Sequence, residues 1–382
     1  MIDKKRLVRL TQELIRINSE NPPGDEVTLA AFVARFLKKN GLRPKIYRFF
    51  HRRDNVLAVL KGRTDRQPLL ITPHLDTVPA GRGWKMGPFS GQIKQGKIYG
   101  RGATDCKGNL AVALEALVSL KEDGFKPEND VIFLATADEE AGSGKGLVPF
   151  LEKNIKRPRF ALILDSDEFN IITAQKGLIH FKVKVSGRKA HGAYPERGIN
   201  AIDKAIELVT VLKKYRFSYR RHRLLKPPTV NIGTIRGGDK VNMVADWCEF
   251  EVDLRFLPGM KAEKILSDIR RIFNRLGVLY KIEVNDIQEP YEIKSSHPLV
   301  RCLTKAGRGI IQAPEIKGSE GATVITFFKK RNIPAVATGY GSSGCAHATN
   351  EFVRINDLIR GAKTLERFIR IFDTQRPTNS VF

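Results

Sequence analysis

The first part of the chain alternates helical and extended hydrophobic patterns. Apolar residues recur at helical spacing within residues 7–17, and a second helical pattern covers residues 27–39. Short apolar stretches then predict strands, and one apolar face predicts a helix at residues 108–120. The predicted strands cover residues 56–60, 69–72, 93–99, 131–135 and 161–164. Because strands alternate with helices, we predict an α/β fold with a sheet covered on both sides.

The pattern changes near Gly177, where a strand with strict alternation begins. The expected order from there is strand, helix, two strands, helix and strand, which is typical of a split α+β sandwich with helices on one face. These elements cover residues 179–185, 200–213, 230–235, 247–254, 265–276 and 279–284. We therefore predict that residues 177–287 form an inserted βαββαβ domain. Residues 1–176 and 288–382 would form the first domain, with a further strand at 335–338.

Composition is that of an ordinary globular protein with two domains. The 382 residues are 42% hydrophobic and 28% charged. The first residues fit an amphipathic helix and not a signal peptide, and no apolar stretch approaches the roughly 20 residues of a membrane span. Four scattered cysteines argue against a thiolate cluster and against a disulfide framework. We expect a cytoplasmic protein with no membrane role.

The formal net charge of +25 raises the question of nucleic-acid binding. Basic residues are densest in the run KKYRFSYRRHR at residues 213–223. Others are spread along the chain, at Arg52, Arg53, Arg270, Arg271, Lys329, Lys330 and Arg331. We favour a solvated basic surface, which attracts acidic substrates or simply keeps the protein soluble, and we expect nucleic acid not to be a partner.

Residues that could bind metal follow several of the predicted strands. In LLITPHLD, alternation places His74 and Asp76 on the same side of the chain, although such a pair alone fits a surface hydrogen bond. In VIFLATADEEAGSG, a buried strand runs into Asp138, Glu139 and Glu140. Adjacent carboxylates in such a place need cations or protons to compensate them, which favours a metal over a solvated loop.

Three further candidates come from strand ends and turns. Asp105 precedes the predicted helix at 108–120, where it could simply cap the helix. Asp165 is the first residue after a strand, and His347 lies in the small-residue loop GYGSSGCAHATNE. Nitrogen and oxygen ligands without thiolates suit zinc, cobalt or manganese, and a pair of metals needs a bridging carboxylate.

Together these motifs closely resemble the zinc-dependent superfamily of aminoacylase, acetylornithine deacetylase, succinyl-diaminopimelate desuccinylase and glutamate carboxypeptidase. The resemblance spans nearly the whole chain. It implies a mixed-sheet catalytic domain with helices on both faces, a lid and dimerisation domain, and two Zn²⁺, with Co²⁺ or Mn²⁺ as possible substitutes. It assigns His74 and Asp165 to one zinc, Glu140 and His347 to the other, Asp105 to both, Glu139 as general base, and Asp76 as the acid that orients His74.

The resemblance also extends to the inserted domain and to one loop of the first. In SGRKAHGAYPERGINAI, His191 matches a histidine that reaches the active site of the partner subunit. Asn242 and Arg255 match residues that contact the substrate, and Gly339 and Gly341 match a loop that lines the substrate cleft. The chain departs from the family pattern at residues 321–324, where GATV has no acid although many members have one.

The function implied is hydrolysis of an amide bond by metal-activated water. The leading interpretation is a deacylase of N-acyl amino acids, acting as a homodimer on a small anionic substrate. A dipeptidase or carboxypeptidase with the same zinc site is the alternative. A third interpretation, a basic binding protein on a relic hydrolase scaffold, is disfavoured because every ligand position and the base are filled.

Overall fold

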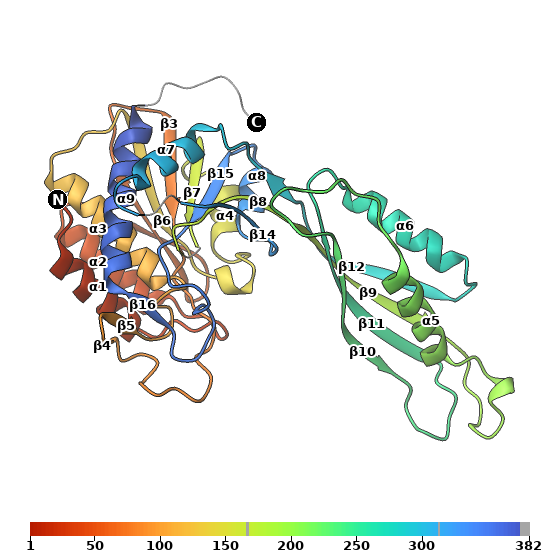
Figure 1. Ribbon diagram of the computed structural model, residues 1–382. Coiled ribbons are helices and arrows are strands. Elements are labelled where there is room, and N and C mark those ends of the chain that lie inside the picture. Colours follow the sequence, from red (N-terminus) through yellow and green to blue (C-terminus); the bar gives the residue numbers. More distant parts are fainter. Residues whose placement is uncertain (166–167, 312–313, 375–382) are drawn as a thin grey trace. The chain divides into compact units, whose positions relative to one another are not determined.

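A computed structural model describes residues 1–165, 168–311 and 314–374 of the chain. The chain divides into two compact units, and each is described by itself (Figure 1). The first unit comprises Met1–Thr173, Ile293–Lys317 and Phe327–Phe382, and the second comprises Ala174–Glu292 and Gly318–Thr326. The hydrophobic pattern did not indicate that the short segment Gly318–Thr326 belongs with the second unit. The predicted limits of the inserted domain, 177–287, stay a prediction.

The helices and strands have the following bounds. The α-helices are α1 (Lys4–Arg16), α2 (Val27–Lys39), α3 (Lys107–Glu122), α4 (Leu147–Glu152), α5 (Ala201–Lys214), α6 (Ala262–Asn274), α7 (Pro298–Gly307), α8 (Ile325–Lys329) and α9 (Ile355–Asp373), and the short 3₁₀ helices are η1 (Glu139–Ala141) and η2 (Pro195–Arg197). The strands are β1 (Lys45–Phe50), β2 (Arg53–Leu60), β3 (Thr64–Thr72), β4 (Gln92–Lys94), β5 (Lys97–Tyr99), β6 (Asn129–Ala135), β7 (Phe160–Leu164), β8 (Ile171–Gln175), β9 (Gly177–Ser186), β10 (Thr229–Gly237), β11 (Trp247–Phe256), β12 (Tyr280–Gln288), β13 (Tyr291–Glu292), β14 (Ile316–Ser319), β15 (Ala335–Thr338) and β16 (Phe352–Arg354).

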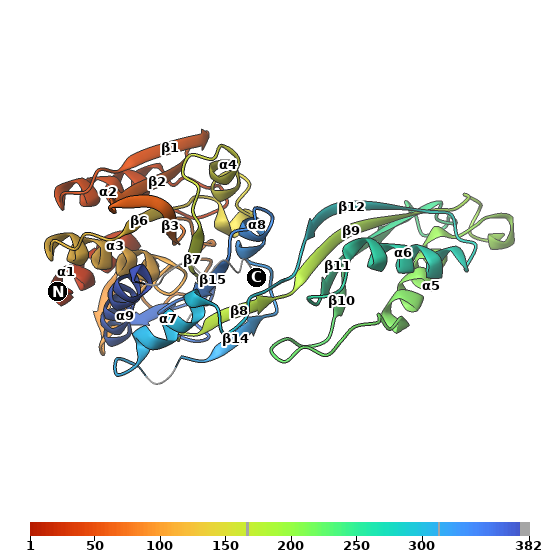
Figure 2. The same ribbon diagram turned by 90° about the horizontal axis from the view of Figure 1, so that it is seen from above.

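The first unit is built on a mixed sheet, as predicted, with the strand order β1-β2-β6-β3-β7-β15-β8. The four central strands β6, β3, β7 and β15 run parallel to one another, and β1, β2 and β8 pair antiparallel. Helices cover both faces, and α3, α7 and α9 pack together on one of them (Figures 1 and 2). Because these four strands are parallel, their carboxyl ends lie at one edge of the sheet, and the residues that lead to that edge are buried and mostly apolar.

The prediction of a single strand at residues 93–99 is wrong. Strands β4 and β5 form an antiparallel hairpin that joins β16 in a separate three-stranded sheet. Gln95 and Gly96 both have positive φ, 50° and 71°, which suits the two central residues of a tight hairpin turn. The single-strand prediction overlooked Gly96, a turn residue that separates the two apolar parts of the run QIKQGKIY at residues 92–99.

The second unit has the predicted βαββαβ order, in the antiparallel sheet β10-β11-β9-β12. Helices α5 and α6 lie on one face of this sheet (Figure 2). The core between them contains Phe181, Phe250, Phe256 and Phe273, which are almost fully buried. No helix among the described residues is both long and apolar enough to cross a membrane.

Candidate metal centre

His74 lies two residues beyond the end of β3 and is 2% exposed. Its Nδ1 lies 2.9 Å from the backbone carbonyl oxygen of Asp76, and the Asp76 carboxylate is 3.6 Å away. An Nδ1–H that donates to this carbonyl fixes the imidazole ring, which leaves Nε2 as the atom that faces the rest of the site. The backbone of Asp76, and not its carboxylate, therefore makes the short contact with His74.

Asp105 lies just before α3 and faces two histidines. One carboxylate oxygen, Oδ1, is 2.9 Å from Nε2 of His74, and the other, Oδ2, is 3.2 Å from Nε2 of His347. His74 and His347 are 273 positions apart in the sequence, yet one carboxylate connects them. A carboxylate that presents one oxygen to each of two imidazoles is arranged to bridge two cations.

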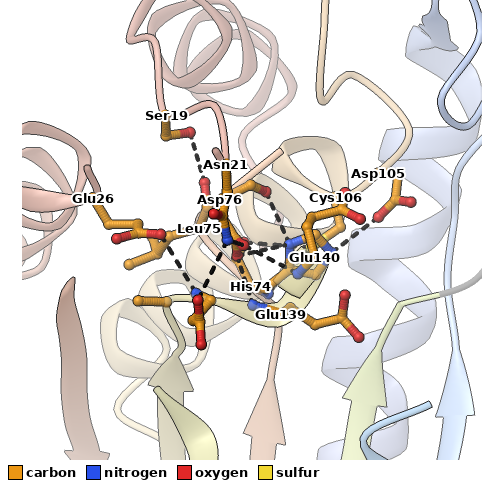
Figure 3. A network of polar contacts seen from close by, with 12 residues as sticks. Ser19, Asn21, Glu26, His74, Leu75, Asp76, Asp105, Cys106, Glu139 and Glu140 are labelled. Carbon is orange, nitrogen blue, oxygen red and sulfur yellow. Dashed lines mark hydrogen bonds and ion pairs between the residues drawn. The ribbon is translucent and has the colours of Figure 1, made fainter. Parts of the chain in front are cut away.

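Glu139 and Glu140 form the start of η1, which follows β6 after residues 136–138. Their backbone N–H groups donate to the two carboxylate oxygens of Asp76, each at 3.0 Å (Figure 3). Asp76 also accepts a hydrogen bond of 2.8 Å from the side chain of Asn21. The Asp76 carboxylate thus holds the turn that carries the predicted general base and a predicted ligand.

The remaining predicted ligands follow β7 and β15. Oδ1 of Asp165 is 3.8 Å from Nε2 of His74, and Nε2 of His347 is 3.2 Å from Oε2 of Glu140. His347 has a positive φ of 61°, and its side chain is 53% exposed. The five predicted metal ligands therefore come together at the edge where β3, β6, β7 and β15 end.

Three sets of donor atoms are close enough to hold a cation, and two of them contain no thiol. The first, here called the His74 group, is His74, Glu139 and Asp165, and the second, the His347 group, is Asp105, Glu140 and His347. Within each group the donor atoms lie within 4.8 Å of one another. His74 and Asp105 also form a third such set with Cys106. Burial raises the pKa of Cys106 to about 12, and its sulfur contacts the backbone N and O of His74, so the thiol fits a structural role better than a ligand role.

The electrostatics of the site favour the binding of positively charged groups. Hydrogen bonds with Asp105 and Glu140 raise the pKa of His347 to about 10. Burial, and then the charge of Asp165, raise the pKa of Glu139 well above its usual range. Oε1 of Glu140 is buried without a hydrogen-bond partner in the described structure. These crowded, partly unsatisfied nitrogen and oxygen donors fit divalent cations.

A model of peptidase family M20/M25/M40 matches residues 70–371, which is most of the chain. The chain belongs to this family. It is an enzyme that acts on amide or peptide bonds. The acetylornithine deacetylase of Proteus mirabilis is 31% identical over 314 residues, covering 78% of this chain and 77% of that protein. The acetylornithine deacetylase of Photorhabdus laumondii is 30% identical and covers 83% of each chain.

Two solved structures show the same fold. Aminopeptidase PepT from Bacillus cereus superposes with a TM-score of 0.81 at 24% identity, over 97% of this chain and 99% of that one. YXEP from Bacillus subtilis, described as a dinuclear metal-binding peptidase of family M20, superposes with a TM-score of 0.74 at 16% identity over 96% and 97%. The resemblance drawn from the motifs is confirmed. The M20 metallopeptidases bind metal ions, and the described residues offer matching groups of donors.

A buried ion pair that sequence reasoning missed holds the Asp105 loop. Glu351 accepts hydrogen bonds from the backbone N–H groups of Gly102, Thr104 and Asp105 at 2.8–3.1 Å. It also pairs with Arg101 at 2.7 Å. Arg101 in turn donates to the backbone oxygens of His347 and Ala348, at 3.4 and 3.2 Å. The Arg101–Glu351 pair therefore connects the loop of Asp105 to the loop of His347. The sequence feature that could have revealed this pair is the acidic residue four positions after His347.

A second buried cation was misplaced by the sequence analysis. Arg53 was counted with the solvated basic surface, but it is 3% exposed. Its Nη2 lies 2.8 Å from Glu26 and 2.8 Å from Asp138, the residue before Glu139. Burial, and then the charge of Asp76, raise the pKa of Glu26 to about 8. Single-sequence patterns give no sign that this arginine is buried, because its acidic partners lie 27 and 85 positions away.

The other predicted site residues lie in two places. In the first unit, Gly339 and Gly341 follow β15, and a Cβ at Gly341 would come within 2.4 Å of Thr104, so this position needs glycine. In the second unit, Nδ1 of the exposed His191 accepts from the backbone of Ala193 at 3.1 Å.

Asn242 and Arg255 also belong to the second unit. Asn242 is exposed, and its backbone oxygen accepts from Gly192 N at 2.9 Å, which sets it beside the His191 loop. Arg255 forms a two-pronged ion pair with Asp253, at 2.6 and 2.9 Å. The guanidinium of Arg255 thus already has a carboxylate partner within its own unit.

Proposed function

We propose that this enzyme is a two-zinc hydrolase that cleaves the amide bond of an N-acyl amino acid. The observation that carries the proposal is the position of Asp105, whose two oxygens face His74 and His347 at 2.9 and 3.2 Å. His74, Asp105 and Asp165 would hold one zinc ion, and Asp105, Glu140 and His347 the other. The absence of a thiolate from these sets also permits Co²⁺ or Mn²⁺.

The chain's own residues would move the proton. When bound, two zinc ions supply a water of lowered pKa, near ~7, and polarise the scissile carbonyl. Glu139 would accept the proton from this water and return it to the leaving amine, as general base and then general acid. Asp76 supports this role because it binds the N–H groups of both Glu139 and Glu140.

An N-acyl amino acid is the substrate class that the relatives favour. Proteins named acetylornithine deacetylase match this chain at about 30% identity over most of their length. The formal net charge of +25 suits a small anionic substrate. A peptidase with the same centre is the second candidate, because structures with the same fold include aminopeptidase PepT.

Other parts of the proposal concern the assembly. We propose that the enzyme is a cytoplasmic homodimer that associates through the second unit, with His191 of one subunit serving the site of the other. Asn242, Arg255, Gly339 and Gly341 would contact the substrate. Sedimentation at working concentration tests the dimer, and a monomer with full activity would remove His191 from the chemistry.

The substrate class is tested with a panel at saturating zinc. N-acetyl amino acids, N-succinyl amino acids and dipeptides are compared by kcat/KM. The proposal predicts that an N-acyl amino acid is the best substrate by more than about tenfold, a difference that one well-placed polar contact can supply. A dipeptide preferred by that margin would establish the peptidase alternative.

A further inference from the structure

The densest run of positive charge in the chain lies in one segment of the second unit. Residues 213–226, here called the basic arm, contain seven lysines and arginines and no acidic residue. The arm begins in the last two residues of α5 and ends before β10. All seven cations are exposed: Lys213, Lys214, Arg216, Arg220, Arg221, Arg223 and Lys226.

Two carboxylates contact the basic arm: Glu320 accepts a hydrogen bond from the backbone N–H of Lys226 at 2.9 Å, and Glu292 lies 3.3 Å from His222. Many other cations of the same unit are paired through their side chains. Lys182, Lys184 and Lys189 each lie within about 3 Å of a carboxylate, at 3.1, 2.8 and 2.9 Å. Within the described part of the chain, none of the seven arm side chains forms an ion pair. Seven adjacent unpaired cations repel one another, and an external anion would relieve this repulsion.

Two pockets adjoin the arm and share aromatic walls. One, of about 580 Å³, lies between the arm and the start of α6, where Lys261, Lys264 and Asp268, the partner of Lys264 at 2.9 Å, also line it. The other, of about 460 Å³, lies between the arm and the start of β10. Both pockets are lined by Phe217 and Tyr219, and Tyr219 is 39% exposed.

We infer that the basic arm binds single-stranded nucleic acid, independently of the hydrolase site. Exposed cations would contact the phosphates, and successive bases would enter the two pockets and stack on Tyr219, as in other single-strand sites. Adjoining pockets with a shared aromatic wall suit a polymer of flat rings, whereas an acidic peptide lacks such rings and a lipid surface cannot enter pockets. This inference revises our sequence-based expectation, because the unpaired charges and the pockets were not visible in the sequence.

The test measures binding of a labelled single-stranded oligonucleotide of about 12 nucleotides, within the usual site sizes, by fluorescence anisotropy at several salt concentrations. The full-length zinc-loaded protein is used. The arm variant combines Arg220→Gln, Arg221→Gln and Arg223→Gln. The matched control combines Arg236→Gln, Arg270→Gln and Arg275→Gln, three exposed arginines of the same unit outside the arm.

We expect the arm variant to bind at least about tenfold more weakly at low salt, with a salt slope smaller by about 2, since each lost phosphate contact contributes roughly 0.7. The control should bind like the wild type. Tyr219→Ala should weaken binding about tenfold, and Tyr219→Phe should restore it, because stacking needs only the ring. Hydrolase activity should be unchanged in all variants, which shows that they fold.

Three results would overturn the inference. The first is no binding by the wild type at low salt, and the second is an equal loss in the arm and control variants. The third is equal binding of heparin, duplex DNA or anionic vesicles with no effect of Tyr219→Ala, which would show a general attraction to polyanions.

Discussion

The two donor groups of the metal centre use the same kinds of ligand in different surroundings. In the His74 group, the imidazole is 2% exposed and is held by the backbone at the end of a buried strand. In the His347 group, the imidazole is 53% exposed and lies on a loop of small residues, which the Arg101–Glu351 pair supports. The first group is therefore fixed by the sheet, whereas the second depends on contacts between loops.

This difference has a consequence for function. A ligand on a buried strand end changes position only if the sheet changes, and the sheet is the core of the first unit. A ligand on an exposed loop can be displaced by altering a few hydrogen bonds. We therefore expect the His347 group to bind its metal more weakly and to tolerate substitution better than the His74 group.

The largest expected effect on turnover comes from Glu139→Gln. Glutamine keeps the size of the side chain and the backbone contact with Asp76, but it cannot accept the proton from water. General bases typically contribute about 10²–10⁴-fold, so kcat should fall by about 10³-fold or more. Although Glu139 lies within the His74 group, His74, Asp105 and Asp165 remain to hold the first zinc, so metal content, measured by elemental analysis, should not change. Activity within tenfold of the wild type would show that Glu139 is not the base.

A pair of ligand substitutions compares the two groups directly. His74→Ala should lower metal affinity by more than about 100-fold, since even replacing a residue that only holds a ligand in place costs about 10–100-fold. His347→Ala should lose only its own metal, and excess Zn²⁺ should restore part of the occupancy. Metal titration of each variant gives these affinities. An equal and irreversible loss in both variants would contradict the proposed asymmetry.

The contribution of the Arg101–Glu351 pair is tested with Glu351→Gln. A glutamine amide can no longer accept all four donors, so the Asp105 and His347 loops should lose their common support. We expect metal affinity of the His347 group to fall by about 10–100-fold. The exposed pair of Arg370 with Asp123 offers a control, and Asp123→Asn should leave metal affinity unchanged. If both variants bind metal like the wild type, the loops are positioned by other contacts.

The smallest expected effect concerns pH in the metal-free protein. His347 has a pKa raised from 6.5 to about 10 by Asp105 and Glu140. Its pairing therefore contributes stability that is fully present below pH 6.5 and lost as the pH rises toward 10. The contribution is small because the side chain is half exposed.

The pH effect is measured as the melting temperature of the metal-free protein between pH 7 and 10. We expect the melting temperature to decline over this range, and to decline less in His347→Ala. Equal slopes in both proteins would show that His347 does not pair with the carboxylates in solution.

Much of the central architecture was predictable from local patterns. His74, Asp105, Glu140 and Asp165 follow strands or turns, and parallel strands bring their carboxyl ends to one edge, so their convergence followed from topology. Arg53 was not predictable in this way, because a buried arginine and an exposed one look the same without their partners. Glu351 was visible in its motif, but its four contacts depend on a loop 250 positions earlier. The hairpin at β4 and β5 was missed because its two short apolar parts were read as one strand, although Gly96 marks the turn between them.

Anomalous diffraction from zinc-soaked crystals, recorded on both sides of the zinc absorption edge, is the most direct test of the shared carboxylate. We predict two peaks per chain, one beside each oxygen of Asp105, with the peak near His347 weaker at limiting zinc. A single peak, or two peaks away from Asp105, would contradict the two-metal centre.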